Sequence, residues 1–171
     1  MLPIMKKNML TIALLLCLSS ANLFAQNNKI SALDIKPLIG FWKGSLTYLD
    51  YQTNKPYTMP ADLEITQIEE SNRFVFSNIY PNEPKANDAD TVTISESGLK
   101  IDDEIITLKR KKNGRLEITT ELTGEDGNDN KAAIIRHIYT IGTNEYVVIK
   151  EVKFVDETKW IKRHEYRYQK N

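Results

Sequence analysis

The sequence predicts an all-β domain, a single antiparallel up-and-down meander closed into a barrel of about 8 to 10 strands, with a short helix before it. From Phe41 onward, apolar and polar residues alternate with a period of two, which is typical of strands with one buried face. Turn-forming residues recur between these runs at short intervals. Connections this short cannot carry a crossover helix, so sequence neighbours should pair, and closure would remove the exposed edges.

The segment before the barrel, residues 26–39, is expected to be a polar leader followed by a short helix. Its stretch ISALDIKPLI, from Ile30 to Ile39, contains Pro37, which limits the length of any helix there. We expect one or two helical turns that deliver the chain to Gly40. The barrel domain then covers residues 40–171.

Ten strands follow from the alternation and from the turn clusters between the apolar runs. They are expected at residues 41–51, 58–69, 72–80, 90–95, 99–102, 104–111, 115–123, 131–141, 145–155 and 158–169. The most specific turn is Asn113-Gly114, because a two-residue type I′ hairpin needs positive φ at both central residues. We therefore expect a hairpin at this position.

Alternation also predicts which side chains face the barrel interior. The inward set comprises Trp42, Leu46, Tyr48, Leu63, Ile65, Phe74, Phe76, Val92, Ile94, Ile106, Leu108, Leu116, Ile118 and Leu122. The last three strands carry apolar residues on both faces, so two phases remain open for them. On the final strand, the inward residues are either His164, Tyr166 and Tyr168 or Arg163, Glu165 and Arg167.

The first 25 residues, MLPIMKKNMLTIALLLCLSSANLFA, predict a secretory signal peptide. Lys6 and Lys7 form its basic region, and the apolar run from Met9 to Leu18 is too short to span a bilayer. Cleavage after Ala25 would leave Gln26 at the new N-terminus. We therefore expect an exported protein, in the periplasm or outside the cell, with no membrane span in the mature chain.

The single cysteine, Cys17, lies inside the apolar run of this signal. Leu16 stands where a lipoprotein signal needs a small residue, which argues against a lipid anchor. The mature chain of about 146 residues is one domain in size and has no thiol for a disulfide, a nucleophile or a metal site. It carries 21 basic and 23 acidic residues, a balance that predicts no nucleic-acid partner.

The order of these features resembles the calycin group, which comprises lipocalins, fatty-acid-binding proteins and lipocalin-like domains of secreted bacterial proteins. The resemblance rests on Gly40-Phe41-Trp42 at the head of the first strand and on the basic residues between Trp160 and Tyr168 on the last. It implies that Trp42, beside Gly40, closes one end of the barrel. It also implies that Arg163 or Arg167 lies across the Trp42 ring as a cation–π contact.

The chain departs from the group at several positions. No mid-chain lipocalin motif is recognisable, and Tyr166-Arg167-Tyr168 puts Arg and Tyr on opposite faces of the strand, unlike the carboxylate clamp of fatty-acid-binding proteins. Some barrels of the group ligate haem iron through a C-terminal His, but the surroundings of His164 do not match theirs. We therefore expect no cofactor.

The signal, the meander and the resemblance favour a protein that binds a small hydrophobic or amphipathic ligand inside the barrel. The candidate ligand-binding residues are Trp42, Tyr48, Phe74, Phe76, His164, Tyr166 and Tyr168. The alternative is a fully packed barrel that acts as an interaction or structural module of the envelope. In that case a partner protein would bind outward residues such as Phe41, Leu49 and Tyr51.

No catalytic motif is recognisable, so we expect no enzymatic activity. The chain has no Gly-x-Ser-x-Gly, His-Glu-x-x-His or phosphate-binding loop. Asp102, Asp103 and Glu104 are adjacent in the chain and are expected to point apart. His137 and His164 lie two strands apart without a close pair of ligands, so we expect no metal site.

Overall fold

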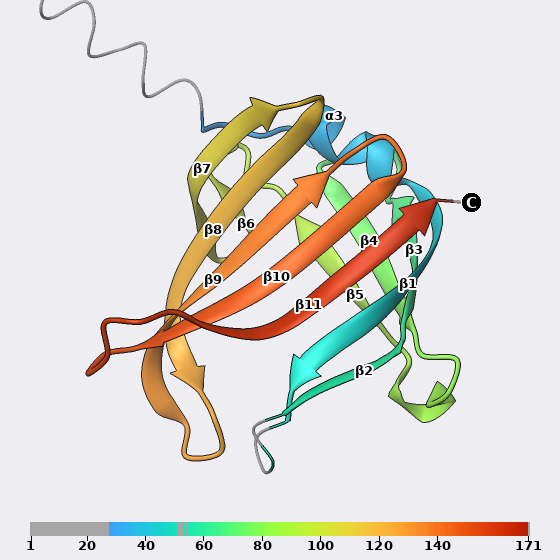
Figure 1. Ribbon diagram of the computed structural model, residues 1–171. Helices are drawn as coiled ribbons and strands as arrows, with labels where there is room; N and C mark the ends of the chain where they lie inside the picture. The colour runs from blue at the N-terminus through green and yellow to red at the C-terminus, as the bar shows by residue number, and fades with distance from the viewer. Residues whose placement is uncertain (1–27, 51–52, 54, 171) are drawn as a thin grey trace, which may run out of the picture.

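A computed structural model describes residues 28–50, 53 and 55–170 and shows an antiparallel β-barrel with a short helix at its N-terminal end (Figure 1). This confirms the predicted fold class. The predicted signal peptide and Tyr51 lie outside the described residues. Within the described part, no helix is both long enough and apolar enough to cross a membrane.

The chain reaches the barrel through two short helical turns, α3 (Ala32–Ile35) and η1 (Lys36–Leu38). The Asp34 carboxylate accepts a hydrogen bond from the Ser31 backbone N–H at 2.9 Å, which caps the first turn. The strands are β1 (Gly40–Leu49), β2 (Pro56–Pro60), β3 (Asp62–Gln67), β4 (Arg73–Ile79), β5 (Asp88–Thr93), β6 (Lys100–Ile101), β7 (Glu104–Lys112), β8 (Arg115–Asp126), β9 (Lys131–Ile141), β10 (Glu145–Phe154) and β11 (Ile161–Lys170). A single 3-10 turn, η2 (Pro84–Ala86), precedes β5.

The strands follow one another around the barrel in the order β5-β4-β3-β1-β11-β10-β9-β8-β7-β6. The first long strand of the chain, β1, pairs with the last, β11. A single bridge between Ile94, which follows β5, and Ile101 of β6 completes the ring. The strand expected at residues 58–69 is divided at Ala61, whose N–H donates to the Gly44 carbonyl at 3.0 Å. The two pieces, β2 and β3, both pair with β1, and β2 lies off the ring.

Trp42 closes the end of the barrel that lies beneath α3 and η1. Its side chain is completely buried, and its indole Nε1 donates a hydrogen bond to the Leu38 carbonyl at 2.6 Å. Ile35, Leu38 and Ile65 belong to the same buried cluster. Burial of these side chains fixes the helical turns against the barrel, because the hydrophobic effect scales with the apolar area removed from water.

The cation over the Trp42 ring is Lys170, which corrects the expectation of Arg163 or Arg167. Lys170 lies opposite Trp42 in the β1–β11 ladder, and its Nζ is 5.1 Å from the ring centroid. Residues alternate along β11, so Arg167, opposite Ser45, falls on the outward face. Arg163 lies near the other end of the strand. The register therefore selects the last basic residue of β11 for this contact.

An arginine does lie over a tryptophan ring, but the ring is that of Trp160 and the arginine is Arg136. The Arg136 guanidinium carbon is 3.7 Å from the Trp160 ring centroid. Arg136 also forms ion pairs with Glu121 at 2.7 Å and Glu151 at 3.5 Å. These contacts connect β8, β9 and β10 with the segment that leads into β11, on the outside of the barrel.

Two bulges alter which residues face the interior. Between Ile106 and Leu108 the register of β7 shifts, so Lys109 lies opposite the buried Ile118, and the inward position expected for Leu108 is wrong. A second shift between Lys150 and Glu151 makes Arg163 the extra residue on β11. At each bulge a charged residue, Lys109 or Arg163, departs from the strict alternation of its strand.

The Gly44→Ala variant is expected to lose about 1–3 kcal/mol of unfolding free energy, because overpacking a full site forces its neighbours to move. A Cβ at Gly44 would lie 2.3 Å from the Arg167 carbonyl oxygen and 2.5 Å from Tyr168 Cδ1. Gly142→Ala is the matched control, since its nearest neighbour, the Glu145 carbonyl, is 3.4 Å away. Urea denaturation measures both variants, and equal losses would contradict the close approach at Gly44.

Candidate functional site

The barrel contains a cavity of about 290 Å³ whose lining changes in character from one part to another. Beneath the helical turns the wall is apolar and includes Ile35, Leu38, Leu63 and Ile141. Elsewhere the wall carries tyrosine, histidine, carboxylate and amide groups from six strands and from the turn after β6. A concave, mainly apolar space with a few convergent polar groups is typical of small-molecule sites.

One wall of the cavity is a row of ring side chains, which we call the aromatic ladder: Tyr146, Tyr168, Tyr166 and His164. Tyr146 and Tyr168 stack with ring centroids 5.8 Å apart, and Tyr168 and Tyr166 stack at 5.7 Å. His164 meets Tyr166 edge-on at 5.3 Å. Alternation on β11 and pairing with β10 create the ladder, because directly paired residues of neighbouring strands share a face.

The other side of the cavity carries three carboxylates, which we call the acidic mouth: Asp90, Asp102 and Glu104. Asp90 lies on β5, Asp102 in the turn after β6 and Glu104 at the start of β7. Asp90 and Asp102 line the cavity and are also solvent-exposed, so they mark its opening, whereas Glu104 is half-buried. In Figure 1, β4 and β5 lie on the far wall of the barrel, behind β9, β10 and β11.

The opening lies where the barrel is least completely closed. Among the described residues, β5 and β6 are joined in the sheet only through the Ile94–Ile101 bridge. The Asp102 carboxylate reinforces this junction by accepting a hydrogen bond from the Thr93 N–H at 2.8 Å. Burial, and the charges of Glu104, Asp103 and Asp90, raise the pKa of the Asp102 carboxyl above its ordinary value. The mouth therefore concentrates negative charge.

Glu104 and His137 form a hydrogen bond inside the cavity, with His137 Nδ1 2.8 Å from a Glu104 carboxylate oxygen. The Thr120 hydroxyl also donates to Glu104. Burial opposes ionisation, but these bonds and the nearby positive charge outweigh it and lower the pKa of Glu104. The pair thus holds one carboxylate ionised and orients one imidazole.

The second histidine of the cavity, His164, is electrically neutral at pH 7. Burial, followed by the charges of His137 and Lys150, lowers its pKa to about 4. Lys150 on β10 lies opposite His164 on β11. Lys150 forms an ion pair with Asp126 at 2.7 Å, and Arg163 forms an ion pair with the same carboxylate at 3.0 Å. The two positive groups beyond the cavity therefore share one carboxylate, that of Asp126.

The structure brings together part of the sequence-predicted site. His164, Tyr166, Tyr168 and Phe76 line the cavity, which resolves the phase of the last strand. Trp42 and Phe74 are completely buried in the core and are not among the lining residues. Tyr48 packs against Tyr57, with ring centroids 5.5 Å apart, and is not in the lining either.

Sequence reasoning missed the carboxylates of the lining and His137. Asp102 and Glu104 both face the cavity, although their adjacency to Asp103 suggested divergent directions; the two-residue spacing was the available signal. His137 joins them through the register of β8, β9, β10 and β11, which places Thr120, His137, Lys150 and His164 in one row. Within the described residues, no group of three or more His, Cys, Asp or Glu could hold a metal ion.

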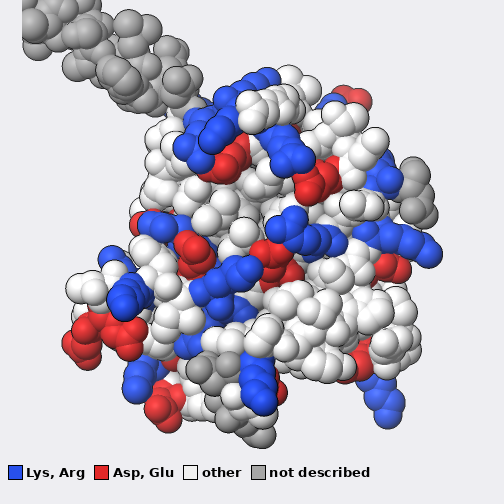
Figure 2. Space-filling view, in the orientation of Figure 1, with Lys and Arg blue, Asp and Glu red and all other residues white. Residues whose placement is uncertain are grey.

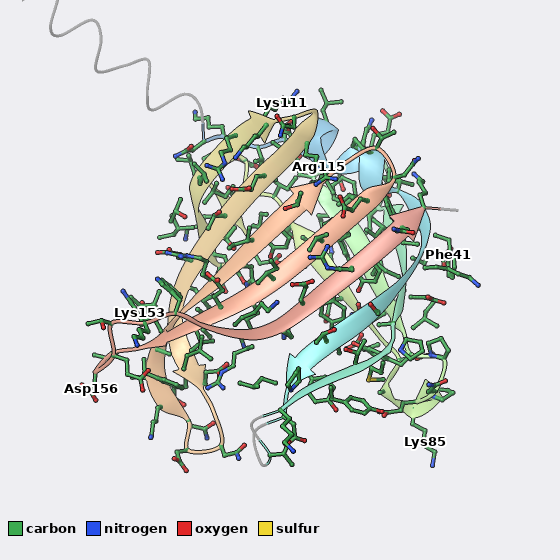
Figure 3. All side chains as sticks on the ribbon, viewed as in Figure 1. Phe41, Lys85, Lys111, Arg115, Lys153 and Asp156 are labelled. Carbon is green, nitrogen blue, oxygen red and sulfur yellow. The ribbon has the colours of Figure 1, made fainter. Side chains whose placement is uncertain are left out.

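The outer surface carries mixed charge. Figure 2 shows basic and acidic side chains intermingled over the face formed by β8 to β11. The labelled Lys111, Arg115 and Lys153 point away from the barrel in Figure 3. Phe41, one of the outward residues suggested as a partner contact, is 43% exposed, and Leu49 is half-buried.

No family model matches this chain, and no curated protein does. Among solved structures it is similar to Rv2717c from M. tuberculosis, with 10% identity and a TM-score of 0.53 over 83% of this chain and 99% of that chain. A protein of unknown function from the DUF3598 family of Nostoc punctiforme aligns with 12% identity over 80% of this chain and 49% of its own, with a TM-score of 0.38. The similarity to Rv2717c concerns the fold alone.

His164 is expected to titrate near pH 4 in the folded protein, against an ordinary value of 6.5. Between these two values the unfolded chain binds the extra proton, so acidification destabilises the fold through this residue. The His164→Gln variant should show a shallower loss of stability between pH 6.5 and pH 4. NMR of the imidazole carbon-bound protons and thermal melts across this range test the expectation, and a midpoint near 6.5 would contradict it.

Proposed function

We propose that this chain is an exported, lipocalin-like carrier or sensor that binds a small amphipathic molecule inside its barrel. The observation that carries the proposal is the 290 Å³ cavity, with its apolar wall on one side and its convergent polar groups on the other. An apolar body would replace water against Ile35, Leu38 and the aromatic ladder. A polar head would reach the acidic mouth or the Glu104–His137 pair.

A binding role accounts for this site better than a catalytic one. Glu104 orients His137, but among the described lining residues no serine, threonine or cysteine is present to act as a nucleophile. The tyrosine hydroxyls are poor nucleophiles, because burial raises the pKa of Tyr146 and Tyr168 well above the ordinary value. We therefore interpret the polar groups as recognition elements.

Filling the cavity should abolish ligand retention without unfolding the barrel. Val148 lines the cavity between ladder residues, so Val148→Trp would occupy part of the space needed by a ligand. Val155→Trp makes the same change at a position that is 67% exposed and serves as the control. Native mass spectrometry of each protein purified from its own host should show a retained small molecule on the wild type and on Val155→Trp alone.

Two results of that experiment would count against the proposal. If the wild-type protein carries no small molecule and takes none up from a host extract after refolding, the barrel has no physiological ligand of this kind. If Val148→Trp retains the molecule, its binding site lies elsewhere. A mass increase from a bound protein chain would instead support the alternative of an envelope interaction module.

Export is expected to remove the first 25 residues. The basic region with Lys6 and Lys7, followed by the apolar run, directs the chain across the membrane, and cleavage after Ala25 leaves a mature protein that begins at Gln26. N-terminal sequencing and intact mass of the protein from a periplasmic or culture fraction test this. Lys6→Glu with Lys7→Glu should retain the precursor in the cytoplasm, and an unprocessed chain in the exported fraction would contradict the assignment.

A further inference from the structure

The cavity presents negative charge to its contents. Its lining includes the three carboxylates of the acidic mouth, and among the described residues no lysine or arginine belongs to it. Of its two imidazoles, His137 is held by Glu104 and His164 is neutral at pH 7. Asp90 and Asp102 have no basic partner within 4 Å among the described residues. An anionic head group would meet repulsion here, whereas a cation would relieve it.

Two tyrosine hydroxyls that open on the cavity point to a second polar group on the occupant. Tyr146 and Tyr168 are only 3% and 2% exposed, and both line the cavity. Neither hydroxyl has a hydrogen-bond partner within the described part of the chain, whereas the Tyr166 hydroxyl is 3.0 Å from that of Tyr80. Neither oxygen is among the buried unpartnered atoms of the described residues, so both are open to the contents of the cavity. A hydrogen-bonding group on a ligand would pair with either of them.

The space between these two features suits a flat, cationic molecule. Ring faces of the aromatic ladder attract both apolar rings and ammonium groups. A cavity of about 290 Å³ lies at the lower end of the size range of small-molecule sites, so we expect a small metabolite as its occupant.

We infer that the ligand is a small organic cation: an ammonium group held by the acidic mouth, attached to a flat apolar body with a hydrogen-bonding group that reaches Tyr146 or Tyr168. The inference rests on the proposed function and narrows it to one chemical class. Asp90 and Asp102 act at the opening, where they also attract cations from solution. Glu104 lies deeper and contacts the ammonium group after it has passed the opening.

Three probes of similar size and different head-group charge test this inference. Tyramine is the cation, 4-(2-hydroxyethyl)phenol is the neutral counterpart, and (4-hydroxyphenyl)acetate is the anion; all three share the phenol and a two-carbon side chain. Calorimetric titration of the mature protein at pH 7 and low salt should give binding at least about tenfold tighter for tyramine than for the neutral probe, and weakest for the anion.

Charge-removing variants locate the effect. Asp90→Asn with Asp102→Asn should weaken tyramine binding by about tenfold or more and leave the neutral probe within about twofold. Asparagine tolerates the positive φ of residue 102, and its amide oxygen can still accept the Thr93 hydrogen bond. Asp103→Asn is the matched control, because Asp103 is adjacent in the chain and is not in the lining.

The outcomes separate the two proposals. Equal binding of tyramine and the neutral probe, tighter binding of the anion, or equal losses in Asp103→Asn and the double variant would overturn the cation assignment and leave the ligand-binding function in place. Failure of all three probes to bind, together with an empty native mass spectrum, would overturn both. A change in neutral-probe binding in the double variant would show that the mouth acts through structure, which also contradicts the inference.

Discussion

The pairing of the first strand with the last decides where every functional side chain points. In this pair of strands, seven residues of β1 lie opposite seven of β11, from Trp42 opposite Lys170 to Tyr48 opposite His164. Side chains alternate along a strand, so a slip of one residue would turn the aromatic ladder outward and bring Arg167 and Glu165 inward. Gly44 opposes this slip, because it lies opposite Tyr168, where only a residue without a side chain fits. After a slip, a neighbour of Gly44 with a side chain would take this place.

The pairing of β1 with β11 also explains which features could be predicted from the sequence and which could not. Period-two alternation and the Asn113-Gly114 turn are local signals, and they predicted the barrel, the order of its strands and the inward position of Trp42. The contact between Trp42 and Lys170 depends on the register of two strands about 120 residues apart. The chain alone offered four lysine or arginine residues on β11, and no local rule distinguishes them. The bulges at Thr107 and Arg163 were likewise invisible in the sequence, because a bulge has no obligatory residue.

The contact between Glu104 and His137 was hidden for a related reason. The two residues lie on β7 and β9, and only the register of both strands with β8 brings them together. Seen alone, each has the surroundings of an ordinary exposed position of a strand. Resemblance to a fold family gave no help here, because a fold fixes where a cavity can form and leaves its chemistry to the individual side chains.

Incomplete closure of the ring links the fold to the site. A barrel normally removes its sheet edges, yet here β5 and β6 meet through one bridge, and the exposed ends near it carry Asp90 and Asp102. Charged residues on an open edge discourage pairing with another chain, and this protective role requires no ligand. It does not, however, account for the opposite wall, where the Tyr146 and Tyr168 hydroxyls open on the cavity without a hydrogen-bond partner among the described residues. These two walls together are the features from which we infer an occupant that interacts with both.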